Sequence, residues 1–443
     1  MGLTPPLKVE KLQVALHTKA KGSPSYRFYA LYDKIYREDV LRHAFDRCLA
    51  NQGKPGVDGE TFKQIEASGV EEWLDELAET LRRQTYRPQP VRRVHIPKEG
   101  QPGKTRPLGI PCIRDRVVQM ATVLVLGPIF EADLEPEQYA YRPERSAKEA
   151  VRQVEALIRA GFTEVVDADL SGYFDSIPHT ELMKSVSRRI SDGRVLRLIK
   201  MWLEAPVETR DRRGRTERTT RNKDEGKGSP QGSPISPLLS NIYMRRFIRG
   251  WKTGGHEQRL KSHIVNYADD FVICCRAGAD EAMATMRSMM EKLKLTVNET
   301  KTRTCELPAD AFVFLGYTFG RGYNHRTGAA YLAASPAKKK IAKLCDAIGE
   351  QTSKRWTYLD EEEMVGRLNR KLRGWANYFD LGTVSRAYNA VNYHVTNRLR
   401  RWLCRKHKVR GPGYSRYPDR YLYQKLSLYR LSRPGRKFPN ATV

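Results

Sequence analysis

Four acidic residues stand in stretches of the chain that are otherwise apolar, at positions 167, 169, 269 and 270. Asp167 and Asp169 lie near the end of the stretch 163–170, which predicts a buried strand. Asp269 and Asp270 lie between two apolar stretches, 263–267 and 271–275, which predicts a hairpin with both carboxylates at its tip. A buried carboxylate is costly unless it is paired or binds a metal, so these acids need a chemical reason.

Clustered carboxylates suit divalent cations. Three of them can hold two Mg2+ ions roughly 4 Å apart, the arrangement used for phosphoryl transfer by in-line displacement. Spacing does not choose between Asp167 and Asp169, because alternate residues of a strand face the same side. The competing interpretation of Asp269 and Asp270 is a solvated or side-chain-capped turn.

The elements that must position these acids follow from apolar spacing. Helical spacing begins at residue 38 and ends at 51–53, and it also covers residues 70–83 and 115–129. Alternation and a Gly/Pro turn predict a basic β-hairpin over 91–108, and residues 208–227 predict an exposed ribbon or loop. Residues 312–317 predict one short strand. After Ser335-Pro336, interpreted as a helix start, the pattern is mostly helical, which places a domain boundary near 325–335.

The whole chain is strongly basic. Its 443 residues include 79 Lys and Arg against 51 Asp and Glu, a formal net charge of +28. This excess disfavours a typical metabolic enzyme and favours a polyanionic partner such as nucleic acid. No apolar run is long enough for a membrane helix, and the first 22 residues contain no secretory apolar core. Seven scattered cysteines without a C-x-x-C pair indicate reduced thiols in the cytoplasm and no zinc site.

The charge is concentrated at the end of the chain. Beyond Asp380 there are 15 Lys and Arg and one acid, so 15 − 1 gives +14 in the last 63 residues. Basic side chains interleaved with tyrosines suit a nucleic-acid surface, where cations meet phosphates and rings stack on bases. The competing interpretation is a solvated charged face whose tyrosines lie in a core. Residues 1–37 are also basic and predict an arm.

The motifs, taken in order, resemble those of group II intron reverse transcriptases. Residues 267–270 (YADD) resemble the active-site motif, and residues 167–175 resemble the first metal-binding motif. Residues 51–59 resemble the N-terminal extension motif, residues 96–111 the fingers hairpin, and residues 228–241 the Pro-Gln-Gly block. Residues 295–302 and 314–317 resemble the two motifs after the catalytic hairpin, and residues 374–379 resemble the maturase signature.

This resemblance implies an α+β right-hand polymerase, with fingers and palm followed by an all-helical thumb/maturase domain and a basic C-terminal tail. Residues 1–37 are expected to form a basic N-terminal arm, and residues 38–330 the fingers and palm with the N-terminal extension. Residues 331–405 are expected to form the helical thumb/maturase (X) domain, and residues 406–443 a basic aromatic nucleic-acid-binding segment.

The resemblance also assigns roles to single residues. Asp169, Asp269 and Asp270 match the metal ligands, which favours Asp169 over Asp167. The residues matching the nucleotide pocket are Lys98 and Arg106 for the triphosphate, Phe174 for excluding a ribose 2′-hydroxyl, Gln231 for lining the pocket and Gly232 for close backbone approach.

Lys301 matches the position of a proton donor to pyrophosphate. In the tail, nucleic-acid binding is expected at Arg398, Arg400, Arg401, Arg405, Lys406, Lys408 and Arg410. The competing interpretations are a solvated strand face for Lys98 and Arg106, core packing for Phe174 and simple exposure for Lys301.

The implied function is RNA-directed DNA synthesis with two Mg2+ ions, for which Mn2+ could substitute. The implied partners are a structured group II intron RNA, target DNA, a primer and deoxynucleoside triphosphates, in splicing (maturase) and in intron mobility (retrohoming). We expect a cytoplasmic bacterial protein, nucleoid-associated on its target, with no membrane partner and no endonuclease activity. The alternatives are a domesticated reverse transcriptase in host defence or DNA repair, a splicing cofactor that no longer polymerises, and a basic RNA-packaging protein.

Overall fold

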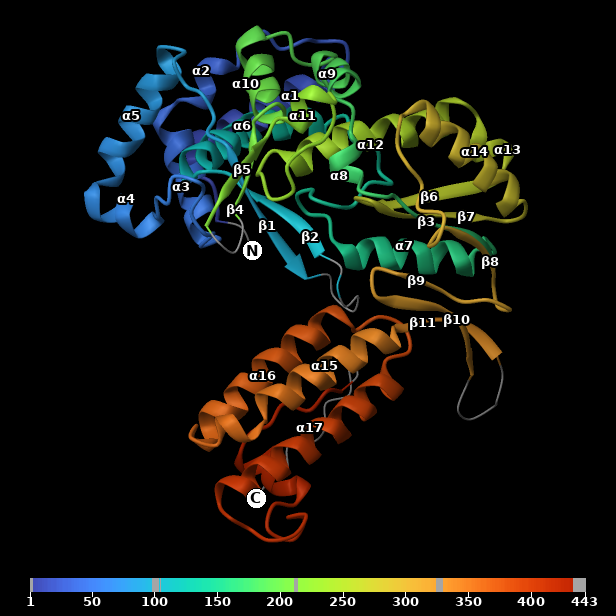
Figure 1. Ribbon diagram of the computed structural model, residues 1–443. Helices are drawn as coiled ribbons and strands as arrows, with labels where there is room; N and C mark the ends of the chain where they lie inside the picture. Colours follow the sequence, from blue (N-terminus) through green and yellow to red (C-terminus); the bar gives the residue numbers. More distant parts are fainter. Residues whose placement is uncertain (1–2, 98–102, 104, 211–213, 324–329, 433–443) are drawn as a thin grey trace.

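A computed structural model describes residues 3–97, 103, 105–210, 214–323 and 330–432. Figure 1 shows three regions: helical fingers, a palm built on a β-sheet, and a separate helical bundle. The predicted α+β fingers and palm followed by an all-helical domain are confirmed. No helix among the described residues is both long and apolar enough to cross a membrane.

The fingers are built around α6 (Ile113–Glu131), which is buried on nearly all sides. Packed around it and over the same core are α1 (Leu7–Gly22), α2 (Tyr32–Ile35), α3 (Glu38–Ala50), α4 (Phe62–Ser68) and α5 (Val70–Arg82). Residues 1–37 were expected to form a separate basic arm, but α1 packs onto the fingers. The apolar residues Val9, Leu16 and Ala20 lie on one face of α1 and are buried in this core.

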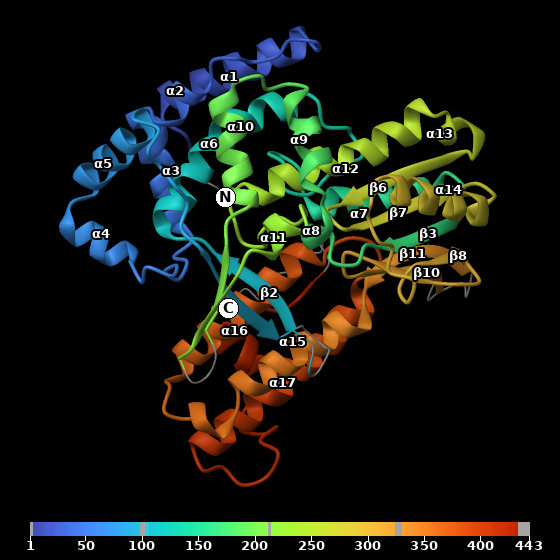
Figure 2. The ribbon, with the colours of Figure 1, turned by 45° about the horizontal axis from the view of Figure 1, so that its top comes forward.

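The basic hairpin and the charged ribbon form one sheet. The predicted hairpin is β1 (Val91–Pro97) with β2 (Thr105–Ile110), and the ribbon is β4 (Val207–Arg210) with β5 (Thr216–Thr219). The strand order is β2-β1-β4-β5, with β1 parallel to β4. Figure 1 and Figure 2 both show the β1–β2 hairpin extending from the fingers toward the helical bundle.

The palm sheet is antiparallel, in the order β6 (Ser262–Tyr267), β7 (Asp270–Cys275), β3 (Glu164–Asp169) and β8 (Arg303–Glu306). Val166 and Ile273 face the core shared with the fingers, whereas Val165 and Val272 face a second core. Because both faces are covered, the strands are continuous apolar runs. The surrounding helices are α7 (Ala147–Arg159), α8 (Tyr173–Ser176), α9 (His179–Ser187), α10 (Gly193–Leu203), α11 (Arg221–Asp224), α12 (Ser236–Thr253), α13 (His256–Arg259) and α14 (Ala279–Lys292).

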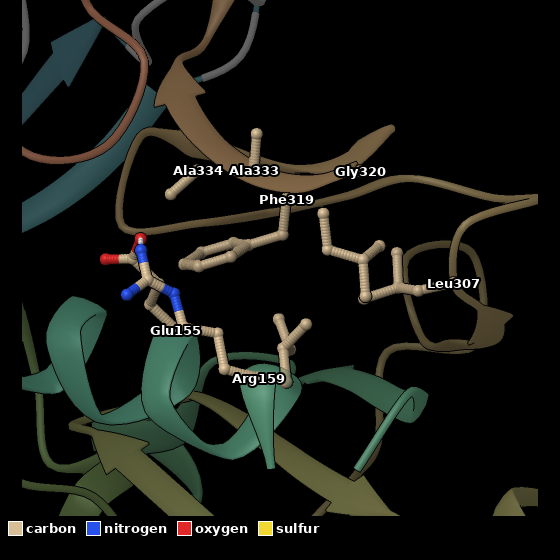
Figure 3. A pocket seen from close by; sticks show the side chains of 9 residues that line it. Glu155, Arg159, Leu307, Phe319, Gly320, Ala333 and Ala334 are labelled. Atoms are coloured by element: carbon tan, nitrogen blue, oxygen red, sulfur yellow. Dashed lines mark hydrogen bonds and ion pairs between the residues drawn. The ribbon is translucent and has the colours of Figure 1, made fainter. Parts of the chain in front are cut away.

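The stretch 312–317 was predicted as one strand, but it is the start of a hairpin. β9 (Phe312–Phe314) turns at Leu315 and Gly316, both with positive φ, into β10 (Tyr317–Tyr323), which pairs with β11 (Ala330–Pro336). Between this sheet and α7 lies a cavity of about 10 Å³, lined mostly by apolar side chains (Figure 3). It is too small to hold a ligand.

The helical bundle has its own core and consists of α15 (Lys338–Gln351), α16 (Glu361–Tyr378) and α17 (Ser385–Lys406), with short helical turns at Lys354–Trp356 and Tyr421–Lys425. Ser335 and Pro336 end β11 and do not cap the helix, whose N-cap is Ala337. The last described residues do not form a separate segment, because Leu428 and Leu431 are buried in the bundle core.

Candidate active site

The three aspartates predicted to bind metal meet at one end of the palm sheet. The β3–β7 register places Asp169 opposite Asp270. The β6–β7 hairpin turns at Ala268, which has a φ of 59°, and at Asp269. Leu170 N–H donates to Asp269 O at 3.3 Å and ties the end of β3 to this turn. Directly paired residues of antiparallel strands have Cβ atoms about 5 Å apart, so these carboxylates share one small space.

The Asp169 carboxylate is held from one side by the loop after α14. Lys301 Nζ and Asn298 Nδ2 both donate to Asp169 Oδ2, at 2.8 and 2.9 Å. Asn298 N–H also donates to Asp169 O at 2.8 Å, and Thr300 Oγ1 donates to Asn298 Oδ1 at 2.8 Å. The amide of Asn298 is thereby oriented with its nitrogen toward Asp169. Asp169 Oδ1 has no hydrogen-bond partner among the described residues.

Burial is the largest influence on the pKa values of the clustered acids, and the acids also act on one another. Burial, and then the charges of Asp167, Asp269 and Asp169, raise the pKa of Asp270 to about 8. Burial raises the pKa of Asp167 to about 6 and also raises the pKa of Asp269. Clustered carboxylates ionise together only when cations compensate them. Oxygen donors of this kind fit Mg2+, so the residues present fit a divalent metal.

The carboxylates do not form a closed ligand set in this side-chain arrangement. Within the described part of the chain, no group of three His, Cys, Asp or Glu side chains converges on one point. Lys301 lies on Asp169, so its ammonium supplies the nearest positive charge to that carboxylate. Asp167 lies two residues back along β3, with Arg303 Nε 4.0 Å from its Oδ2.

A cavity of about 370 Å³ opens beside these aspartates. Its lining includes Asp169, Asp269 and Lys301 of the predicted catalytic residues and Arg106, Phe174 and Gln231 of the predicted nucleotide-binding residues. Asp270 is not part of this lining. Arg106 comes from β2 of the fingers, whereas the aspartates come from the palm. A second cavity of about 600 Å³ shares Arg106, Phe174 and Gln231 and adds Gly232. Lys98 lies outside the described residues.

The loop carrying Gln231 and Gly232 is fixed against its neighbours. Ser229 N–H donates to Phe174 O at 2.7 Å, and Gly109 N–H donates to Gln231 O at 2.6 Å. Gly232 has a φ of 112°, and a Cβ there would lie 2.5 Å from Gly109 O. The close approach at Gly232 is therefore made to Gly109 of β2 in the fingers, and the role of this glycine toward substrate stays a prediction.

Asn298 and Tyr141 are site residues to which sequence reasoning gave no role. Asn298 lies in the motif 295–302, but its contact with Asp169 depends on the loop docking onto β3. Tyr141 lines both cavities, and its ring centroid is 6.5 Å from that of Phe174. Its backbone has a positive φ of 58°. A glycine at this position would have indicated such a conformation in the sequence, but the residue is a tyrosine.

The tail residues differ among themselves. Arg401, Arg405, Lys408 and Arg410 are exposed. Arg400 is 2% exposed, pairs with Asp419 and donates to Tyr417 O, so the prediction that it contacts nucleic acid is wrong. The half-buried Arg398 and Lys406 donate to backbone carbonyls at the ends of α15 and of the following turn, and these bonds hold α17 in place.

Comparison with known proteins gives two family matches. Residues 96–319 match the family described as reverse transcriptase (RNA-dependent DNA polymerase), and residues 341–421 match the group II intron maturase-specific domain. Protein YkfC of Escherichia coli is 35% identical over 347 residues, which covers 70% of this chain and 87% of YkfC.

The group II intron-encoded protein LtrA of Lactococcus lactis subsp. cremoris is 33% identical over 220 residues, which covers 49% of this chain and 34% of LtrA. The chain thus matches only about a third of LtrA. A solved partial Cas6-RT-Cas1–Cas2 complex is 23% identical with a TM-score of 0.34, covering 59% of this chain and 41% of that one. The first family match spans half of the chain, and the chain belongs to the reverse transcriptases, RNA-directed DNA polymerases, of the group II intron type that carry a maturase-specific domain.

Proposed function

We propose that the cavity beside Asp169, Asp269 and Asp270 is a polymerase site that extends a DNA primer on an RNA template. The observation that carries this proposal is the β3–β7 register, which sets Asp270 opposite Asp169, together with a cavity lined by Asp169, Asp269 and Arg106. The primer 3′-oxygen would attack the α-phosphorus of a deoxynucleoside triphosphate and form a phosphodiester bond. The bond to pyrophosphate breaks, and the hydroxyl proton leaves to water.

We propose that the three aspartates hold two Mg2+ ions. The raised pKa of Asp270 supports this, because burial and the charges of Asp167, Asp269 and Asp169 cause it, and a bound cation would offset both. When bound, the ions would lower the pKa of the 3′-hydroxyl and neutralise charge on the phosphates. Mn2+ could replace them, since it accepts the same oxygen donors.

The remaining roles belong to side chains around the cavity. The Arg106 guanidinium, together with Lys98, would hold the triphosphate, since a planar fork suits phosphate oxygens. The Phe174 ring would lie beneath the sugar and exclude a 2′-hydroxyl, and Gln231 would line the sugar edge. Lys301 would donate a proton to pyrophosphate, and its ion pair with Asp169 keeps its ammonium beside the cavity.

The maturase-specific match supports a second activity, binding of a group II intron RNA to assist its splicing and, with target DNA, its mobility. The exposed cations Arg401, Arg405, Lys408 and Arg410 at the end of the bundle would contact RNA phosphates. Such a protein would work in the cytoplasm and at the nucleoid.

The test is DNA synthesis on a primed RNA template in Mg2+, comparing wild-type protein with Asp269→Ala. We expect the variant to lose cDNA synthesis while keeping RNA binding. Appreciable synthesis by the variant would refute the assignment of the metal site. Splicing without incorporation by wild-type protein would favour the non-polymerising cofactor. Sequencing the RNA that copurifies with the protein would distinguish an intron partner from a domesticated role.

A further inference from the structure

Tyr141 is presented by a strained but firmly held backbone. Its φ of 58° is uncommon for a bulky residue. On one side, Asn241 Nδ2 donates to Ala140 O at 2.7 Å. On the other side, the Arg142 guanidinium forks onto Glu131 and also donates to the backbone carbonyls of residues 135 and 138. Strained conformations persist only where the surroundings impose them, and they gather at functional sites.

The Tyr141 ring is not part of a core. The residue is 54% exposed, and its hydroxyl has no hydrogen-bond partner among the described residues. Its ring meets Phe174 edge to face, and both rings line both cavities. An exposed aromatic side chain that lines a cavity and stands on a firmly held backbone is suited to contact a flat ligand.

Four residues are common to the two cavities: Arg106, Tyr141, Phe174 and Gln231. Arg106 presents a cation, and Gln231 presents an amide. The two rings are therefore the apolar surfaces of this shared wall. The parts of a nucleotide that match such a wall are the sugar and the base, whereas the triphosphate matches Arg106.

We propose that Tyr141 is a specificity-determining residue of the nucleotide pocket, whose ring packs against the nucleoside part of the incoming deoxynucleoside triphosphate. This inference rests on the proposed polymerase function. It adds a second aromatic wall, distinct from the expected sugar contact of Phe174. Arg106 binds the triphosphate, and Tyr141 binds the nucleoside.

The division between phosphate and nucleoside contacts can be tested with two ligands. Tyr141→Ala should raise the KM for deoxynucleoside triphosphate about 5- to 150-fold, because ring stacking on a base is worth roughly 1–3 kcal/mol and 1.4 kcal/mol is tenfold. The same variant should leave unchanged the inhibition constant of inorganic tripolyphosphate, which has no nucleoside. Arg106→Ala should raise both values. Tyr141→Phe should behave as wild type, and Tyr29→Ala, an equally large removal at a 71% exposed tyrosine outside the cavities, should change neither.

A glycine variant separates the ring from the backbone strain. Tyr141→Gly removes the ring but suits the positive φ, so it should keep or raise the Tm while raising KM as alanine does. An unchanged KM in Tyr141→Ala and Tyr141→Gly would overturn the proposal, as would a matching rise in the tripolyphosphate inhibition constant, which indicates a collapsed pocket. If Asp269→Ala stayed active instead, the proposed function itself would fail, so the two failures are distinguishable.

Discussion

The end of the palm sheet and the end of the helical bundle both concentrate charge, but they treat it in opposite ways. In the palm, Asp270 has acids as its nearest charged neighbours, and burial adds to their effect on its pKa. In the bundle, Arg400 is buried with its hydrogen bonds satisfied by Asp419 and Tyr417 O. Buried acids that raise one another's pKa indicate a site for cations, whereas a buried charge whose hydrogen bonds are satisfied indicates a structural role.

The largest expected effect lies in the palm. Asp270→Asn should reduce DNA synthesis by more than about 10³-fold, since metal-ion catalysis contributes several kcal/mol and 1.36 kcal/mol is tenfold in rate. Primer-extension rates on an RNA template would measure this. Asp280→Asn, an exposed aspartate on α14, is the matched control and should keep the wild-type rate. Equal rates for the two variants would remove the contrast between the palm acids and surface acids.

A smaller loss is expected at the residue that positions Asp169. Asn298→Ala should lower activity or metal affinity about 10–100-fold, as is usual when a partner of a metal ligand is removed. Thr300→Val should lower it less, because it frees the Asn298 amide to turn, and Thr300→Ser should restore it. Glu299→Gln serves as the control, since Glu299 is exposed and pairs with Arg287. Binding of Mn2+ measured by electron paramagnetic resonance supplies a readout besides turnover.

The bundle can be tested with two adjacent arginines. Arg400→Ala should destabilise the protein by about 2–3 kcal/mol, because it removes a buried guanidinium and leaves Tyr417 O without its charged donor. Arg401→Ala, at an exposed neighbour, should change the free energy of unfolding by less than about 0.5 kcal/mol. Thermal unfolding monitored by circular dichroism would compare them. Similar stabilities would mean that Arg400 has no structural role.

The smallest effect concerns pH. Burial lowers the pKa of His179, whose Nε2 lies 2.7 Å from Gly228 O. The folded state therefore favours the neutral ring, so the stabilising contribution is present above the ordinary pKa of about 6.5 and declines as pH falls below it. His179→Gln should flatten this dependence. Unfolding midpoints between pH 5 and 8 would show it, and parallel curves for both proteins would exclude the contribution of His179.

The palm was predictable because its signals are local. The apolar runs around Asp169 and Asp270 fix two strands, and a strand buried on both faces needs no alternation. The bundle tail was less predictable. Leu428 and Leu431 are buried because Asn369 and Asn392 hydrogen-bond to the backbone of residues 427–431, and no short-range pattern shows such contacts. Tyr141 was missed for a related reason, since one anchor of its backbone, Asn241, lies about 100 residues further along the chain.

An anomalous diffraction map of the protein with template, primer, a non-reactive nucleotide and Mn2+ would locate the ions themselves. Two manganese peaks within bonding reach of carboxylate oxygens from residues 169, 269 and 270 are the result we expect. A map in which manganese lies elsewhere while the nucleotide occupies the cavity would contradict the proposal that these three side chains form the reaction centre.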